Sequence, residues 1–272
     1  YVAGATRGRG LFDWAAKSGH VGIADTTLSQ LDGGTLAFDV DQIRAMAHAG
    51  DTLHYVARTT PSFQCTVRVG PDIRTDSVPF ACAPDFTREG LALDGAGNRY
   101  YFEAGAYRVL RLDAAGLLYG SVDGRWNRVG IDVAVDPNGL VWVVGGIGSQ
   151  GDTLFGGFIA RHAFELSDEP AWEAEPDDTI LWTAIAMGEY GPIVLGHEGY
   201  GERLHARGYD FDGALQWEWS HEPAPQTYVD AAAVDAEGSL IACGTRYEGH
   251  QTPIGDDEHH PVLFKFGLQT PE

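Results

Sequence analysis

A short apolar segment that ends in a glycine-containing turn occurs five times along the 272-residue chain. The turn glycines are separated by 47, 42, 52 and 47 residues, and they are Gly50, Gly97, Gly139, Gly191 and Gly238. An alanine stands five residues before every one of them. A period of this length indicates repeated supersecondary units that bury their apolar faces by stacking on their neighbours.

Each repeat has the pattern of a β-hairpin followed by two further strands. The turn residues are mostly Asp, Asn and Gly, which tolerate the positive φ that a tight hairpin requires. A second apolar segment follows each turn, at residues 53–57, 100–103, 140–144, 192–195 and 240–243. Four strands in ~45 residues, without helical periodicity, predict a β-propeller of four-stranded antiparallel blades. A β-sandwich is the alternative, but it would not repeat one turn motif in register.

The repeats predict a single all-β domain over residues 1–272 with six blades. We expect the blades at approximately 1–39, 40–85, 86–126, 127–176, 177–224 and 225–272. Residues 1–4 match the end of a second strand and residues 263–267 match a third, so both terminal blades are expected to be incomplete. The expected total is 22 strands. The alternative is a seven-bladed propeller whose native chain continues beyond both ends.

Two segments carry a resemblance to known propeller families. The stretch Val-Ala-Val-Asp-Pro-Asn-Gly-Leu-Val-Trp-Val-Val-Gly at 133–145 resembles the repeats of bacterial extracytoplasmic proteins of the SBBP and NHL types. The stretch Tyr-Asp-Phe-Asp-Gly-Ala-Leu-Gln-Trp at 209–217 is similar to a quinoprotein-like blade. The resemblance extends over nearly the whole chain and implies the fold. It leaves the activity open, because these families contain binding modules, scaffolds and enzymes.

The charge of the chain narrows the classes of partner. Its net charge is −21 and its pI is near 4.6, so nucleic acids and anionic lipid surfaces would repel it. Hydrophobic residues make up 44% of the chain, which is enough to build a full core. No apolar run reaches the ~18 residues of a membrane-spanning helix. We therefore expect a protein or a glycan as partner, with no nucleic acid and no membrane insertion.

Long connections are expected on one rim of the propeller. The segments between second and third strands are long at residues 5–20, 146–157, 197–204 and 245–260, whereas the first turn of each repeat is short. In an antiparallel blade these long segments emerge at the same end as the connections between blades. Long insertions on one face of a repeat array mark a working surface, although neutral drift in surface loops is the alternative.

Aromatic, basic and imidazole side chains on this rim are the candidate binding residues. Aromatic rings stack on sugar faces or anchor a protein partner, and arginine binds carboxylates. Packing between blades and surface ion pairs are the alternative roles. The candidates are Trp14, Arg7, Arg9, Tyr200, His221, Tyr247 and His250.

Carboxylates and imidazoles on the same rim are candidate metal ligands. Asp256, Asp257 and His259 form the densest group, and His197 and Glu198 lie in the preceding blade. Such side chains bind Zn²⁺, and carboxylates alone bind Ca²⁺. Their spacing matches no known metal motif, and a solvated acidic loop is the alternative. We recognise no catalytic constellation, and no helix is expected after the glycine-rich segment 145–151, as a dinucleotide loop would require.

Two of the three cysteines are predicted to form a disulfide. Cys65 would lie directly opposite Cys82 if residues 69 and 78 face each other across a loop at 70–77, and cross-strand neighbours are close to disulfide geometry. A disulfide implies an extracellular or periplasmic setting. Two buried thiols in a cytosolic protein are the alternative. Cys243 is expected to be a small buried side chain.

Together these features favour a non-enzymatic extracytoplasmic binding or scaffold propeller that recognises a protein or glycan through its long-loop rim. No cofactor is expected unless a divalent metal, Ca²⁺ or Zn²⁺, is bound. The first alternative is a metal-dependent hydrolase or lactonase with a divalent ion at the channel mouth and a metal-bound water as nucleophile. The second is a structural subunit of a surface assembly, in which incomplete terminal blades pair with neighbouring chains.

Overall fold

The structure is a computed structural model of the whole chain. It describes residues 2–7, 17–24, 30–39, 42–49, 52–59, 63–69, 75–80, 90–103, 108–114, 118–123, 128–149, 153–163, 165–166, 169–174, 179–199, 201–223, 226–235, 238–248 and 258–266. Up to residue 80 it gives the backbone and its strand pairing, with Ala47 the one side chain included. Most side chains are described from residue 90 onwards.

The first half of the described chain forms three antiparallel sheets. Sheet one contains β1 (Val2–Arg7), β2 (Lys17–Ala24) and β3 (Gln30–Asp39). Sheet two contains β4 (Gln42–Ala49), β5 (Thr52–Thr59), β6 (Phe63–Val69) and β7 (Thr75–Phe80). Sheet three contains β8 (Leu91–Leu93), β9 (Arg99–Glu103), β10 (Arg108–Leu112) and β11 (Leu118–Asp123).

The second half repeats this plan. Sheet four contains β12 (Arg128–Val135), β13 (Val141–Ser149), β14 (Thr153–His162) and β15 (Trp172–Glu173). Sheet five contains β16 (Ile180–Met187), β17 (Pro192–Glu198), β18 (Arg203–Tyr209) and β19 (Leu215–His221). Sheet six contains β20 (Thr227–Val234), β21 (Leu240–Glu248) and β22 (Glu258–Phe266). The described residues thus form 22 strands, the number that the repeats predict, and none of them is helical.

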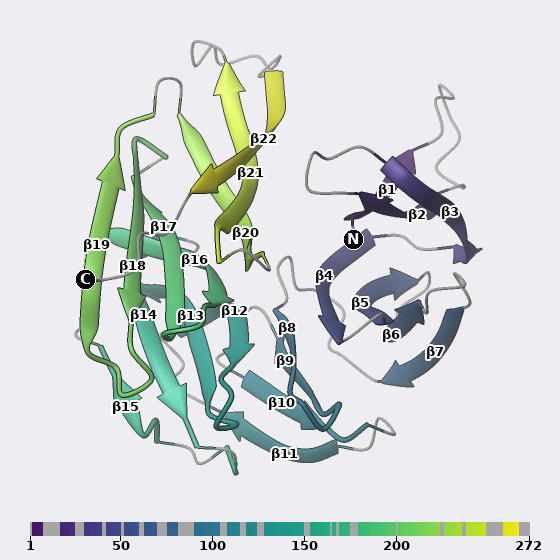
Figure 1. Cartoon of the computed structure of the whole chain (residues 1–272), viewed down its shortest axis with the longest axis horizontal. Helices are drawn as coiled ribbons and strands as arrows, with labels where there is room; N and C mark the ends of the chain where they lie inside the picture. The colour runs from purple at the N-terminus through teal and green to yellow at the C-terminus, as the bar shows by residue number, and fades with distance from the viewer. Residues whose placement is uncertain are drawn as a thin grey trace.

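Successive sheets follow one another around a common centre, with the first strand of sheets two to six innermost (Figure 1). Contacts between neighbouring sheets run through these inner strands: β1 and β2 contact β4, β4 contacts β8, β8 contacts β12, β12 contacts β16, and β16 contacts β20. Within the described ranges, no helix is long and apolar enough to cross a membrane.

The core lies between the faces of adjacent sheets. Buried side chains of sheets three and four form one cluster, those of sheets four and five a second, and those of sheets five and six a third. The repeated alanine lies in these interfaces at Ala92, Ala134 and Ala186, each buried against the following sheet. A small side chain is required there because the inner strands of adjacent sheets approach closely.

A β-bulge in the inner strand explains a glycine that recurs in the second strand. The pairing register of sheets four, five and six shifts at residues 130–132, 182–184 and 229–231. Gly145, Gly196 and Gly244 lie beside these shifts, and a Cβ at any of them would overlap a carbonyl oxygen of the bulged strand. Each glycine is therefore required by the close approach of two backbones.

The turn motif is held by the aspartate at its first position. Gly97, Gly139 and Gly238 have φ of 81°, 81° and 77°, as predicted for tight hairpins. In each turn the glycine N–H donates to the carbonyl of the aspartate three residues earlier. The aspartate carboxylate also accepts backbone N–H groups of the turn, from the second and fourth following residues in the case of Asp94 and Asp136.

The connections between second and third strands are shorter than predicted, because the paired strands extend into them. The segment 146–157 is mostly ladder, since β13 and β14 pair from Val141↔His162 to Ser149↔Thr153. The glycines of this segment favour a loop when the sequence is read alone, yet their backbones form the same strand pairs as the neighbouring residues. The segments 5–20 and 245–260 likewise pair as far as Arg7↔Lys17 and Glu248↔Glu258, and residues 8–16 and 249–257 lie outside the described residues.

The predicted opposition of Cys65 and Cys82 is wrong. Residue 69 pairs with Thr75 rather than with residue 78, so Cys65 lies opposite Pro79. Cys82 lies beyond the end of β7, outside the described residues. The register depends on the length of the turn after β6, which the sequence did not determine. The extracellular or periplasmic setting inferred from a disulfide therefore loses this support.

The prediction that Cys243 is buried is also wrong. Its side chain is exposed on β21. Partial burial and the charge of Asp230 raise the pKa of the Cys243 thiol, which makes it a poor nucleophile at neutral pH.

Candidate functional site at the rim of sheet five

The structure describes the side chains of three of the predicted site residues: His197 and Glu198 at the end of β17, and His221 at the end of β19. Arg7, Tyr247 and His259 are placed by their backbone only, and Tyr247 pairs with His259 across β21 and β22. The remaining candidates lie outside the described residues: Trp14, Arg9, Tyr200, His250, Asp256 and Asp257.

The hairpin of β17 and β18 brings charged side chains to the rim. Its turn spans residues 199–202, where Gly199 and Gly201 have φ of 52° and 79°. The N–H groups of Gly201 and Glu202 both donate to the carbonyl of Glu198, at 3.1 and 3.2 Å. The carbonyl of Gly201 accepts the N–H of Thr227 at 3.0 Å, which fixes the turn against the start of β20.

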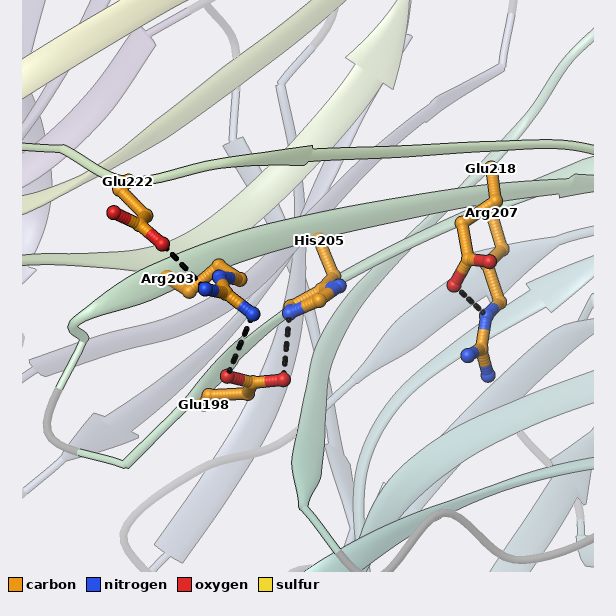
Figure 2. A network of polar contacts seen from close by, with 6 residues as sticks. All are labelled: Glu198, Arg203, His205, Arg207, Glu218 and Glu222. Carbon is orange, nitrogen blue, oxygen red and sulfur yellow. Dashed lines mark hydrogen bonds and ion pairs between the residues drawn. The ribbon is translucent and has the colours of Figure 1, made fainter.

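A network of charged side chains surrounds this turn (Figure 2). Arg203 on β18 lies between two carboxylates: it forms an ion pair with Glu222, just after β19, and its Nη1 is 3.7 Å from Oε2 of Glu198. The hydrogen bond between Arg203 and Glu222 raises the pKa of Arg203 and lowers that of Glu222. The side chains of Arg203 and Glu222 are 41% and 71% exposed, so this part of the network faces solvent.

His205 supports the network from its buried side. Its residue surface is 7% exposed, and its Nε2 lies 3.2 Å from Oε1 of Glu198. This distance allows an ion pair when the imidazole is protonated, but the angles do not satisfy a hydrogen bond. Within the described part of the chain, Nδ1 has no hydrogen-bond partner. Glu198 thus contacts both the exposed Arg203 and the buried His205, one through each carboxylate oxygen (Figure 2).

His197 and Glu198 are adjacent in sequence but serve opposite faces of sheet five. His197 is buried, and its ring contacts that of Tyr228 on β20 edge-on with centroids 4.8 Å apart. Glu198 points to the other face, as strand alternation requires. The two side chains therefore do not converge on one metal ion. No group of three or more His, Cys, Asp or Glu residues is arranged to hold a metal among the residues searched, those that the structure describes.

An aromatic contact lies at the same end of sheet five, on the opposite face from Arg203, because His221 shares the face of Leu204 and His197. His221 is exposed and stacks on Trp219, with ring centroids 5.7 Å apart and planes at 21°. Trp219 in turn meets Phe266 of β22 edge-on at 5.1 Å. We refer to Glu198, Arg203, His205, His221 and Glu222 as the rim cluster.

A second ion pair on the same strands lies further from the rim. Nε of Arg207 on β18 donates to Oε1 of Glu218 on β19 at 2.8 Å (Figure 2). The guanidinium of Arg207 lies 5.0 Å from the centre of the Trp182 ring. This pair was not predicted from the sequence, and neither were Arg203, His205 and Glu222. The available signal was the alternation of basic side chains at residues 203, 205 and 207, typical of one face of a strand.

A buried carboxyl joins the inner strands of sheets four and five. Asp132 on β12 accepts the N–H of Val133 at 2.9 Å and the N–H of Ile185 on β16 at 3.0 Å. Burial raises the pKa of Asp132 to about 7, despite these two hydrogen bonds, which lower it. The group is therefore half-protonated near neutral pH.

This carboxyl predicts a pH dependence of stability. Its pKa is raised by folding from 3.8 to about 7, so the folded state binds the proton more tightly and stability falls as pH rises between these values. From pH 5 to 8 we expect this group to lower the free energy of unfolding by at most roughly 3 kcal/mol, because Asp132 keeps some exposed surface. Urea unfolding of the wild type and of Asp132→Asn measures the effect. Equal pH dependence in both proteins would contradict the assignment.

Comparison with solved structures identifies the fold. The structure of a streptogramin B lyase matches with 12% identity over 94% of this chain and 76% of that chain, at a TM-score of 0.56. A chain of a nidogen/laminin complex matches with 10% identity over 85% of this chain and 84% of that one, at 0.57. A putative gluconolactonase matches with 18% identity over 80% of this chain and 76% of that one, at 0.53.

No protein-family model matches the sequence, and comparison with curated proteins gives no match. At identities of 10–18%, these matches indicate a shared fold but not a shared activity. The solved structures that match are β-propellers, and the antiparallel sheets of this chain follow one another around a centre in the same way. The chain is therefore an all-β protein with the β-propeller fold.

Proposed function

We propose that this chain is a non-enzymatic binding module that recognises a protein or a glycan through the rim cluster of sheet five. The observation that carries the proposal is that the end of β19 presents the exposed pair of Arg203 and Glu222 on one face of sheet five and the stacked rings of His221 and Trp219 on the other. This arrangement lies at the end of the sheet where the second and third strands connect. The rim that the sequence indicates as a working surface therefore presents charged and aromatic groups together.

The chemistry of the rim cluster suits hydroxyl-rich or charged partners. Carboxylates such as Glu198 and Glu222 accept hydrogen bonds from sugar hydroxyls or from basic side chains, and the guanidinium of Arg203 donates to acidic groups. The imidazole of His221 offers a face for stacking, because Trp219 already covers its other side. Ion pairing holds these groups in place before a partner arrives, which reduces the entropy lost on binding.

The fold by itself does not choose between binding and catalysis. Its structural neighbours include a lyase, a putative gluconolactonase and a component of a nidogen/laminin complex. The proposal of a binding module depends on the rim cluster instead. The proposed setting is extracellular or periplasmic, as the resemblance of residues 133–145 implies.

Paired substitutions test the proposal. Arg203→Ala with Glu222→Ala removes the ion pair at the rim, together with the longer contact of Arg203 with Glu198. Arg207→Ala with Glu218→Ala removes a similar pair from the same strands, away from the rim. On an array of neutral and acidic oligosaccharides, we expect the rim variant to bind its strongest wild-type hit at least about tenfold more weakly. The control should stay within about twofold of the wild type.

Two results would count against the proposal. Equal loss of binding in the rim variant and the control would show that the rim cluster has no specific role. Hydrolysis of a panel of sugar lactones by the wild type, lost in the rim variant, would favour the enzymatic alternative. Thermal unfolding of all three proteins shows whether a loss of binding reflects a loss of fold.

A further inference from the structure

The turn between β12 and β13 contains the one asparagine of the chain that precedes a glycine. The asparagines are Asn98, Asn127 and Asn138, and they are followed by Arg, Arg and Gly. Asn138 is exposed, and its side-chain amide makes no hydrogen bond with the residues that the structure describes. Asn98 differs, because its Nδ2 donates to Oδ2 of Asp94 at 2.7 Å. Asn138 therefore combines an unrestrained amide with the smallest possible following residue.

An Asn–Gly sequence converts without an enzyme. The backbone nitrogen of the glycine loses its proton to hydroxide and attacks Cγ of the asparagine, and the side-chain amide leaves as ammonia. Water then opens the resulting succinimide ring at either carbonyl. The product is aspartate or, when the backbone continues through the side-chain carboxyl, isoaspartate. The attack is easiest at glycine, because the absence of a Cβ leaves the nitrogen uncovered.

The turn holds the attacking nitrogen in hydrogen bonds. The N–H of Gly139 donates to the carbonyl of Asp136 at 2.9 Å. The N–H groups on either side, of Asn138 and Leu140, both donate to Oδ1 of Asp136, at 2.8 and 3.0 Å. Attack requires the Gly139 N–H to give up its proton, so its hydrogen bond with Asp136 has to open first. Asp136 thus keeps the site closed in the folded chain.

We propose that Asn138 is a site of spontaneous deamidation, that the turn of Asp136 keeps the reaction slow, and that conversion to isoaspartate loosens sheet four. Isoaspartate lengthens the backbone between residues 138 and 139, so the N–H groups of Gly139 and Leu140 no longer meet Asp136. The other oxygen of Asp136 accepts the indole N–H of the buried Trp142 at 3.2 Å, and the altered turn withdraws this acceptor. The turn therefore sets how long the protein keeps its fold.

This site is separate from the rim cluster. The β12–β13 turn joins the first and second strands of sheet four, whereas the rim carries the connections between second and third strands. In an antiparallel sheet these two kinds of connection lie at opposite ends. The proposal therefore does not depend on the binding function proposed above.

Peptide mapping by mass spectrometry tests whether the turn protects the site. The whole chain is incubated in mildly alkaline buffer, either folded or in guanidinium chloride, and isoaspartate at residue 138 is quantified over time. We expect the conversion to be at least about tenfold slower in the folded chain, because it proceeds only while the turn is open. Asn98, which precedes Arg99, is the internal control and should keep its amide in both samples. Equal rates in the two samples, or no conversion in guanidinium chloride, would overturn the proposal.

Pro137→Ala tests the same step in a folded variant. Pro137 is exposed and fixes φ at the second position of the turn. Alanine leaves the hydrogen bonds to Asp136 in place but lets the turn open more often, so Asn138 should convert roughly two- to fivefold faster than in the wild type. An unchanged rate would contradict the proposal, because opening of the turn would then not limit the reaction.

Thermal unfolding of the incubated protein measures the consequence for sheet four. The fraction that carries isoaspartate at residue 138 should have a Tm at least about 5 °C below that of the unconverted fraction. Asn138→Ser removes the side-chain amide and keeps a residue that favours turns, so its Tm should match that of fresh wild type within about 2 °C and stay constant during incubation. Equal Tm values for the converted and unconverted fractions would overturn the proposed loosening of sheet four.

Discussion

Gly145→Ala is expected to lower the free energy of unfolding by roughly 3 kcal/mol or more. A Cβ at residue 145 would overlap the carbonyl oxygen of Val129 and the Cα of Gly130 in the bulge of β12. Backbone atoms in a paired ladder do not move aside as the end of a flexible side chain would. The strain therefore falls on the contact between the first two strands of sheet four. Urea unfolding followed by tryptophan fluorescence measures the change.

Gly95→Ala is the matched control for this substitution. Gly95 lies in the exposed turn between β8 and β9, and a Cβ there meets no atom within 4 Å. Its φ is outside the left-handed range, so alanine is compatible with the backbone. We expect a change within about 0.5 kcal/mol. A similar loss in both variants would mean that the bulge does not constrain Gly145.

Asp136→Ala is expected to cost roughly 2–4 kcal/mol. The buried carboxylate of Asp136 accepts the N–H groups of Asn138 at 2.8 Å and Leu140 at 3.0 Å. It also accepts the indole N–H of Trp142 at 3.2 Å, and Trp142 is completely buried. Removal of the carboxylate leaves the indole donor without this partner and without access to water. Thermal unfolding by calorimetry gives the loss directly.

The same motif at Asp210 provides the comparison. Asp210 accepts the N–H groups of Asp212 at 3.0 Å and Ala214 at 2.8 Å, and the amide of Gln216 at 2.9 Å. These contacts are exposed, so water replaces the carboxylate when it is removed. Asp210→Ala should cost under about 1 kcal/mol. If Asp210→Ala lowered the stability as much as Asp136→Ala, burial of the indole donor would not be the cause of the loss in Asp136→Ala.

The sequence predicted the features that depend on neighbouring residues. The positive φ of Gly97, Gly139 and Gly238 follows from the turn chemistry within four residues. The burial of Ala134 and Ala186 follows from their repeated position on the inner strand. Local geometry repeats with the sequence, so five copies of one motif were enough to predict the strands and the propeller.

Features that depend on pairing register were not predictable. A difference of three residues in the β6–β7 connection moved Cys65 from the expected position opposite Cys82 to one opposite Pro79. The glycines of 145–149 favoured a loop, but β13 continues through them and pairs with β14. In both places the outcome depends on a partner strand, which the residues of one segment do not specify.

In the candidate site, too, some residues were predictable from their neighbours in sequence and others depended on strand pairing. Glu198 and His221 were identified because they lie in polar segments expected at the rim. Arg203 and His205 were missed because they look like ordinary strand residues until the hairpin places them beside Glu198. The sequence thus indicated the surface, whereas the contacts that organise it required the register of β17 and β18.

The opposite directions of His197 and Glu198 restrict how this surface can evolve. One residue inserted within β17 would exchange the two faces of the strand. The carboxylate of Glu198 would then face Tyr228 on sheet six, and the imidazole of His197 would face Arg203. Substitution of rim side chains, or a hairpin lengthened beyond its last paired residues, would therefore change the proposed binding surface and leave the ladder intact. An insertion inside the ladder would damage the fold and the proposed binding surface together.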